Sequence, residues 1–166
     1  MEIWDGYRAD GTLAGVNLIR GEKVPEGLYH LVCEIIVEHR DGSILAMRRD
    51  PRKPNHPGAW ETTAGGSALR GEGSLECALR ELREETGIRP EQLELLRREV
   101  SDPAHSIFYM YRAETDCDKA SVVLQEGETV DFRWIPPEEF PAFVREDMIP
   151  SQRRRYGAFL KSRGYL

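Results

Sequence analysis

The feature that most constrains the fold is a pair of glycines followed by a short and strongly acidic helix. Gly65-Gly66 precedes a segment whose pattern predicts a helix from Ser74 to about Thr86. Ser74 is suited to cap the first turn, and Gly87 is suited to the left-handed conformation that ends a helix. Pro90 then prevents the helix from continuing. The segment is therefore predicted to form a loop, a helix and a second loop.

Helical periodicity gives this helix an apolar stripe and an acidic face. At about 100° per residue, one stripe that we expect to face the core contains Leu75, Ala78, Leu79 and Leu82. Glu81, Glu84 and Glu85 gather beside it, although like charges at this spacing repel and the carboxyl end of a helix disfavours negative charge. A solvated helix face is one explanation. The other is a site for a hard divalent cation such as Mg²⁺, which prefers oxygen ligands.

Composition limits the class of protein. The chain has 166 residues, of which 40% are hydrophobic and 31% charged, and its formal net charge is -6. These values predict one folded domain over residues 1–166 and argue against a nucleic-acid polymer as partner. The three cysteines form no CxxC pair, and no stretch has the pattern of a signal peptide or a membrane span. We therefore expect a cytoplasmic protein with reduced thiols.

The order of elements predicts a mixed α/β fold. Asp10-Gly11 and Asp41-Gly42 each suit the turn of a β-hairpin, the first within an N-terminal extension over residues 1–29. A proline-rich loop spans residues 51–58, and two helices are expected near Glu138–Arg145 and Ser151–Arg163. The other expected strands are Leu31–Glu38, Ser43–Arg48, Leu93–Val100, Ser106–Arg112, Ser121–Leu124 and Thr129–Ile135. Strands and helices that do not strictly alternate favour a mixed sheet with helices on its faces.

The spacing of the charged residues resembles a known motif. From Gly66 the chain reads Gly, five residues, Glu72, seven residues, and then the run Arg80-Glu81-Leu82-Arg83-Glu84-Glu85-Thr86-Gly87-Ile88. This matches the Nudix box, Gx5Ex7REUxEExGU with U apolar, at every defined position. The box covers residues 66–88. The chain is thereby identified as a member of the Nudix hydrolase family, and its N-terminal hairpin and length resemble the branch related to isopentenyl-diphosphate isomerase.

The resemblance implies a fold, an activity and a set of site residues. It implies an α/β/α sandwich around a mixed sheet, and hydrolysis of a diphosphate linkage in a nucleoside diphosphate derivative with Mg²⁺ or Mn²⁺. Glu81, Glu84 and Glu85 would be metal ligands together with the carbonyl of Gly66. Glu72 and Arg80 would form a structural brace for the loop. Dimers are common among relatives, so a homodimer is an open expectation.

The expected mechanism is attack by water on a phosphorus atom of the diphosphate, assisted by metal ions. A glutamate not fully engaged with metal would accept the proton, and we take Glu84 and Glu128 as candidates beside the catalytic metal ligand Glu85. Basic residues near the proline-rich loop are candidate phosphate ligands, namely Arg48, Arg49, Arg52 and Lys53. Five aromatic residues could stack on a base, namely Trp60, Phe108, Tyr109, Tyr111 and Trp134. Aromatic residues in strands more often belong to the core.

Two alternatives differ in chemistry. An isopentenyl-diphosphate isomerase would resemble this layout, but it needs a Cys and a metal-binding His where this chain has Gly65-Gly66-Ser67-Ala68. A non-catalytic nucleotide-sensing module would be expected to have lost carboxylates of the box, and all of them are present. The substrate is left open among ADP-ribose, a nucleoside di- or triphosphate, and a nucleotide sugar. Pro103, 15 residues after the box, is weak support for ADP-ribose.

Overall fold

A computed structural model describes residues 1–166, with strand β3 (His30–His39) at the centre of a seven-stranded mixed sheet. Its apolar run Leu31–Val37 lets it pack on both faces. It pairs in parallel with β8 (Ser106–Thr115), and antiparallel with β4 (Ile44–Arg49) and β6 (Thr63–Ser67). The remaining strands are β5 (Trp60–Glu61), β7 (Gln92–Ser101) and β9 (Thr129–Ile135).

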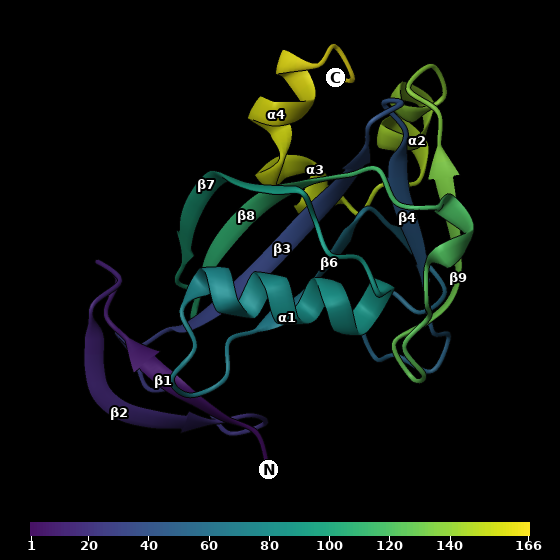
Figure 1. The fold of residues 1–166 in the computed structure, drawn as a ribbon. Helices are drawn as coiled ribbons and strands as arrows, with labels where there is room; N and C mark the ends of the chain where they lie inside the picture. Colours follow the sequence, from purple (N-terminus) through teal and green to yellow (C-terminus); the bar gives the residue numbers. More distant parts are fainter.

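Helices cover both faces of the sheet (Figure 1). Alternate residues of β3, from Leu31 to Val37, pack with helix α1 (Ser74–Thr86) in one buried cluster. Ile36 points the other way and belongs to a second cluster with the C-terminal helices. These helices are α2 (Phe140–Glu146), α3 (Pro150–Arg155) and α4 (Gly157–Ser162). The predicted α/β/α sandwich with a mixed sheet is confirmed.

The N-terminal hairpin forms a separate two-stranded sheet, β1 (Ile3–Tyr7) with β2 (Leu13–Ile19), at one end of the molecule (Figure 1). Backbone hydrogen bonds between Tyr7 and Tyr29 join it to the chain that enters β3. It also contacts the loop between β6 and α1, where Arg70 N donates to Ile3 O (2.9 Å) and Gly71 N to Asp5 Oδ2 (2.7 Å). The hairpin is thus attached to the loop that belongs to the predicted box.

Three local predictions were wrong. Ser74 does not cap α1, because Gly73 is the capping residue and the Ser74 hydroxyl pairs with the Tyr111 hydroxyl (2.8 Å). Residues 121–124 form no strand: Ser121 ends a short 3₁₀ turn (η1, Lys119–Ser121), and Val123 N donates to Thr86 O at the end of α1. The last helix divides into α3 and α4 at the buried Tyr156, whose hydroxyl donates to carbonyls of the sheet.

The apolar stripe of α1 was predicted only in part. Leu75 and Leu79 are 49% and 42% exposed, whereas Ala78 and Leu82 are buried, together with Cys77 and Thr86. At 100° per residue, the buried face is rotated away from the two leucines and toward Glu81 and Glu85. The helix therefore turns its carboxylates toward β6 at the expense of two apolar contacts.

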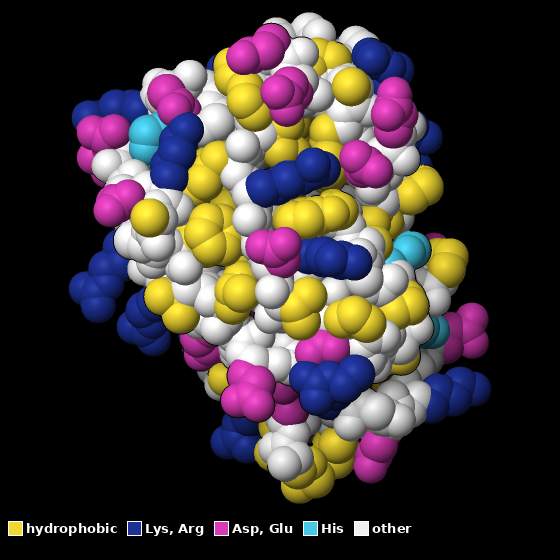
Figure 2. Space-filling model, turned by 90° about the vertical axis from the view of Figure 1, so that its right-hand side faces the viewer, with side chains coloured by type: hydrophobic (Ala, Val, Ile, Leu, Met, Phe, Trp, Pro, Cys, Tyr) yellow, Lys and Arg dark blue, Asp and Glu magenta, His cyan; other side chains and the backbone are white.

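The molecular face that carries β9 shows acidic and basic side chains interspersed among apolar ones (Figure 2). Cations on this part of the fold lie over aromatic rings, with Arg133 over Trp60 (4.7 Å to the ring centroid) and Lys119 over Trp134 (5.8 Å). None of the helices is both long enough and apolar enough to span a bilayer.

Candidate functional site

Two glycines bring the backbone of β6 into close contact with its neighbours. A Cβ atom on Gly65 would lie 2.0 Å from the carbonyl oxygen of Cys33 in β3, and one on Gly66 would lie 2.5 Å from Glu81 Oε1 in α1. No side chain fits in either place without displacement. The Gly66 carbonyl faces α1 as well, since it accepts a weak hydrogen bond from Cys77 Sγ (3.6 Å). The chain thus places a bare backbone edge beside the acidic face of α1.

The three carboxylates on the acidic face of α1 have different surroundings. The Glu81 side chain is 13% exposed, whereas that of Glu84 is 40% exposed. Glu85 accepts a hydrogen bond from Gly65 N (3.2 Å). Burial raises the pKa of Glu85 well above its ordinary value, and the nearby charges of Glu81 and Glu61 raise it further. Burial also raises the pKa of Glu81. This cluster holds more negative charge than its hydrogen bonds compensate.

Arg80 joins the loop to the acidic face. Its Nε donates to Glu72 Oε1 (2.6 Å), and its Nη2 donates to Glu72 Oε2 (2.9 Å) and to the Ser67 carbonyl (3.1 Å). Its Nη1 donates to Glu81 Oε1 (2.7 Å) and Glu84 Oε2 (3.2 Å). Hydrogen bonding to Glu72 holds the pKa of Arg80 above its ordinary value. The geometry is that of the predicted brace, extended to two carboxylates of the helix.

The donor set suits a hard divalent cation. Glu81, Glu85 and the Gly66 backbone supply oxygen atoms in one place, and the cluster lacks positive charge of its own apart from Arg80. The side chains do not already surround one point: no three His, Cys, Asp or Glu side chains are arranged as a metal site. Glu81 and Glu84 are instead turned to Arg80.

Two adjoining cavities of about 230 Å³ each open at this cluster. Both are lined by Arg20, Gly65, Gly66, Glu85 and Glu128. The first extends toward α3 and also has Arg49, Lys53, Glu61 and Gln152 in its wall. The second extends along α1 and includes Glu2, Arg80, Glu81 and Glu84. We call the two together the carboxylate cavities.

The candidate phosphate ligands divide between the cavity and the outer surface. Arg49 lies in the wall and pairs with Glu61 (2.9 Å), and Lys53 pairs closely with Glu128. Arg48 lines neither cavity, and its Nε donates to the Gly58 carbonyl (3.3 Å). Arg52 is 78% exposed and is held by Asp50. Because successive residues of a strand point to opposite faces, Arg48 and Arg49 do not reach the same site.

The base candidates Glu84 and Glu128 both line the cavity along α1. Glu128 comes from the turn before β9, where Asp50 N donates to its carbonyl (2.9 Å). The candidate base is therefore held by the same segment that carries Lys53 and Asp50.

Several wall residues were missed by sequence reasoning. Arg20 and Glu2 come from the N-terminal hairpin, and Gln152 comes from α3 near the opposite end of the chain. Gln152 Nε2 donates to Thr63 Oγ1 (2.7 Å) and Glu61 Oε2 (3.2 Å), while its buried Oε1 has no partner. Glu61 could have been identified from the sequence. Residues 61, 63 and 65 are spaced by two, so in an extended chain the Glu61 side chain lies on the same face as Gly65. Arg20 and Gln152 could not have been identified in this way.

The aromatic, cysteine and histidine residues do not line the carboxylate cavities. Of the five aromatic residues considered for base stacking, Tyr111 is buried and Phe108 is covered by Arg155 (4.3 Å to the centroid). His30 stacks on Trp4 (ring centroids 4.1 Å apart). Cys33 and Cys77 are fully buried between β3 and α1. The aromatic residues serve the packing of the protein itself.

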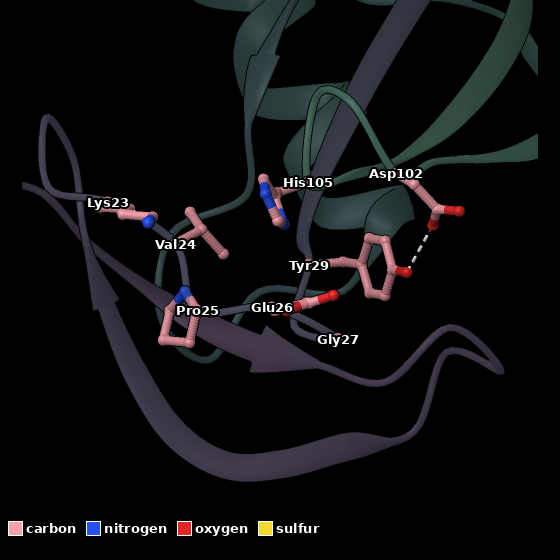
Figure 3. A pocket seen from close by; sticks show the side chains of 8 residues that line it. All are labelled: Lys23, Val24, Pro25, Glu26, Gly27, Tyr29, Asp102 and His105. Atoms are coloured by element: carbon pink, nitrogen blue, oxygen red, sulfur yellow. Dashed lines mark hydrogen bonds between the residues drawn. The ribbon is translucent and has the colours of Figure 1, made fainter.

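The largest hollow of the molecule lies elsewhere. A cavity of about 830 Å³ lies between residues 23–29 and the turn between β7 and β8 (Figure 3). Three of its polar side chains are already paired, since the Tyr29 hydroxyl donates to Asp102 Oδ1 (2.6 Å) and His105 Nδ1 lies 3.3 Å from the Leu28 carbonyl. It contains no carboxylate cluster, so we place the candidate site at the carboxylate cavities.

Comparison with known proteins identifies the same motif-bearing region. The family model described as NUDIX domain matches residues 28–157. An uncharacterised Nudix hydrolase of Listeria monocytogenes is 36% identical over 143 residues, which cover 86% of this chain and 84% of the relative.

Solved structures share the fold. A crystal structure from Deinococcus radiodurans superposes with a TM-score of 0.68 at 20% identity, over 87% of this chain and 89% of that one. The NUDIX domain of the Shewanella oneidensis protein NrtR, solved with ADP-ribose, superposes with a TM-score of 0.53 at 20% identity, over 72% and 78% of the two chains.

Proposed function

The chain belongs to the Nudix hydrolase family, and we propose that it cleaves a diphosphate linkage in a nucleoside diphosphate derivative with the help of Mg²⁺. One observation carries this proposal. The acidic face of α1 is turned toward β6, where Glu81 and Glu85 lie against the backbone of Gly65 and Gly66, which have no side chains. A merely solvated helix face would not turn inward and leave Leu75 and Leu79 exposed.

We propose that Glu81, Glu85 and the Gly66 carbonyl hold the metal, with Glu84 as a further ligand. Mn²⁺ is an expected substitute, because it accepts the same oxygen donors. When bound, a divalent ion neutralises charge on the phosphates and makes water more acidic. The residues of the chain then have separate tasks: Arg80 and Glu72 fix the loop, and the wall of the cavity orients the anion.

Proton transfer is assigned to Glu84 or Glu128. Both line the cavity along α1 and are partly exposed, so either carboxylate can accept a proton from a water molecule there. Lys53 and Arg49 are proposed phosphate ligands, and each would exchange a glutamate partner for a phosphate oxygen. The same assignment leaves Arg48 outside the site.

Two alternatives receive no support from the geometry. An isomerase would need a cysteine and a histidine at the site, and neither residue type lines the carboxylate cavities. A sensing module would not require the full set of carboxylates, which is present here. ADP-ribose, nucleotides and nucleotide sugars are all retained as proposed substrates, and the relationship to the isomerase-like branch stays a prediction.

The test is a panel of these substrates assayed with Mg²⁺ and with Mn²⁺, using the wild type and Glu85→Gln. Glutamine keeps the shape of the side chain and removes one ligand charge, so we expect a loss of at least about 100-fold in kcat/KM and weaker Mn²⁺ binding by paramagnetic resonance.

The matched control is Glu76→Gln, which removes a glutamate from the exposed first turn of the same helix. It is expected to retain activity within about twofold, because surface changes away from the site have small effects. Wild-type inactivity on the whole panel, or full activity of Glu85→Gln, would contradict the proposed function.

A further inference from the structure

Arg20, just after β2, lies in the wall of both carboxylate cavities although it is outside the region matched by the family model. Its backbone N donates to the Glu2 carbonyl (3.1 Å), which holds the end of the hairpin together. The hairpin is in turn bonded to the loop at Arg70 and Gly71. Arg20 is therefore fixed at the rim of the site by backbone contacts on both sides.

Four basic side chains line these cavities, and all four pair with glutamates, so the surroundings of each pair decide which cation is available to a ligand. Arg80 binds Glu72, Glu81 and Glu84 in a setting where its side chain is 18% exposed. Arg49 pairs with Glu61, and Lys53 pairs with Glu128. The cationic side chains of these three pairs are only 17–20% exposed, so a phosphate must compete with an established partner of a largely covered cation.

Arg20 differs from these three cations in its exposure to water. Its side chain is 63% exposed, and its one carboxylate contact is Nη1 to Glu2 Oε2 at 3.0 Å. Exposed pairs of this kind contribute little, so exchanging Glu2 for a stronger anion costs little. The planar guanidinium can then bind two phosphate oxygens at once, which is the arrangement that makes arginine selective for phosphate.

The charge of the site also calls for such a residue. Seven glutamates line the two cavities, namely Glu2, Glu34, Glu61, Glu81, Glu84, Glu85 and Glu128. A diphosphate entering this field is repelled unless cations accompany it. A metal ion at the acidic face of α1 would offset part of this repulsion. An exposed guanidinium at the rim would offset another part of this repulsion.

We propose that the N-terminal hairpin is a substrate-binding element, and that Arg20 leaves Glu2 to bind a phosphate group of the substrate. This rests on the proposed function in taking the ligand to be a diphosphate. It assigns the hairpin a role in selecting substrates with a terminal or bridging phosphate at the rim. In the absence of ligand, the ion pair with Glu2 keeps the Arg20 side chain near the cavity.

The experiment compares Arg20→Ala, Arg20→Lys and Glu2→Gln with the wild type. Calorimetric binding of methylenediphosphonate in the presence of Mg²⁺ needs no turnover. Arg20→Ala is expected to weaken binding about tenfold, which is the loss of one charge-assisted contact, and Arg20→Lys to restore part of it. Glu2→Gln frees Arg20 and removes a repelling charge, so it is expected to tighten binding about twofold.

The control variant is Arg8→Ala, which removes an arginine of the same hairpin whose guanidinium donates to the Leu13 carbonyl, away from the cavities. It is expected to bind methylenediphosphonate like the wild type. On the substrate turned over in the panel, Arg20→Ala should raise KM about tenfold and change kcat less than threefold. A purely structural role for the hairpin would not move Arg20→Ala and Glu2→Gln in opposite directions.

The outcomes separate the two proposals. Unchanged binding in Arg20→Ala, equal weakening in Arg8→Ala, or no binding of methylenediphosphonate by the wild type overturns the role of Arg20. Weaker binding in Arg20→Ala alone supports it, whether or not any panel substrate is hydrolysed. Absence of hydrolysis by the wild type counts against the proposed function only.

Discussion

The rim of the candidate site contains two arginine–glutamate pairs that consist of the same residue types and differ in their surroundings. Arg80 and Glu72 are 18% and 20% exposed, and Arg80 makes further bonds to Ser67, Glu81 and Glu84. The side chains of Arg20 and Glu2 are 63% and 29% exposed and share one side-chain contact. The comparison teaches that the number of partners and the shielding from water decide whether an ion pair holds the structure or is free to bind a ligand.

The largest expected effect on stability comes from removing the shielded arginine. Arg80→Met leaves Glu72 and Glu81 without a cationic partner in a partly buried place. We expect the free energy of unfolding to fall by about 2–3 kcal/mol, somewhat less than for a fully buried pair. Urea denaturation measures this change. Arg83→Met, on the exposed face of the same helix, serves as the control and should cost less than about 0.5 kcal/mol. Equal losses of stability in the two variants would mean that Arg80 stabilises the protein no more than an exposed arginine of the same helix does.

The second expected effect is a pH dependence of the free energy of unfolding. It arises from His30, which contacts the hairpin, and not from the Arg80–Glu72 pair. Burial lowers the pKa of His30, which stacks on Trp4 of the hairpin, to about 4 from an ordinary value of 6.5. The unfolded chain therefore takes up a proton more readily, so stability is complete above pH 6.5 and falls as the pH drops toward 4. The ring is partly exposed, so we expect a loss of about 2 kcal/mol between pH 7 and pH 4.5.

His30→Asn should remove this part of the pH dependence, as measured by urea denaturation at the two pH values. His56→Asn, a change in the exposed proline-rich loop at a position of positive φ (49°), should leave it intact. The Arg80–Glu72 pair has no such sensitivity in this pH range, since hydrogen bonding to Arg80 lowers the pKa of Glu72. A pH dependence that persists in His30→Asn would assign it to carboxylates instead.

The smallest expected effect is that of Arg20→Met on stability. Because the pair with Glu2 is exposed, its loss should change the free energy of unfolding by less than about 0.5 kcal/mol. Thermal or urea denaturation provides the measurement. A loss approaching that of Arg80→Met would mean that Arg20 holds the hairpin, and the two arrangements would no longer be different in kind.

Sequence reasoning located the parts of the fold and site that depend on local pattern. The central strand, the helix ending at Gly87 and the Glu72–Arg80 contact all follow from residues near one another in the chain. It did not locate Arg20 or Gln152, because their positions depend on how a hairpin and a C-terminal helix dock on the sheet. It also misjudged Leu75 and Leu79, since apolar periodicity does not reveal that a helix turns its charged face inward.

The missing Cβ atoms of Gly65 and Gly66 have a consequence for how this protein can diversify. A side chain on Gly65 would collide with the backbone of Cys33, and one on Gly66 would displace the Glu81 carboxylate, so substitution at either position disturbs the floor of the site. The proline-rich loop differs, since a Cβ atom on Gly58 would meet nothing within 4 Å. A gene of this kind is therefore expected to change its chemical preferences through insertions and substitutions in this peripheral loop, while the centre is inherited intact.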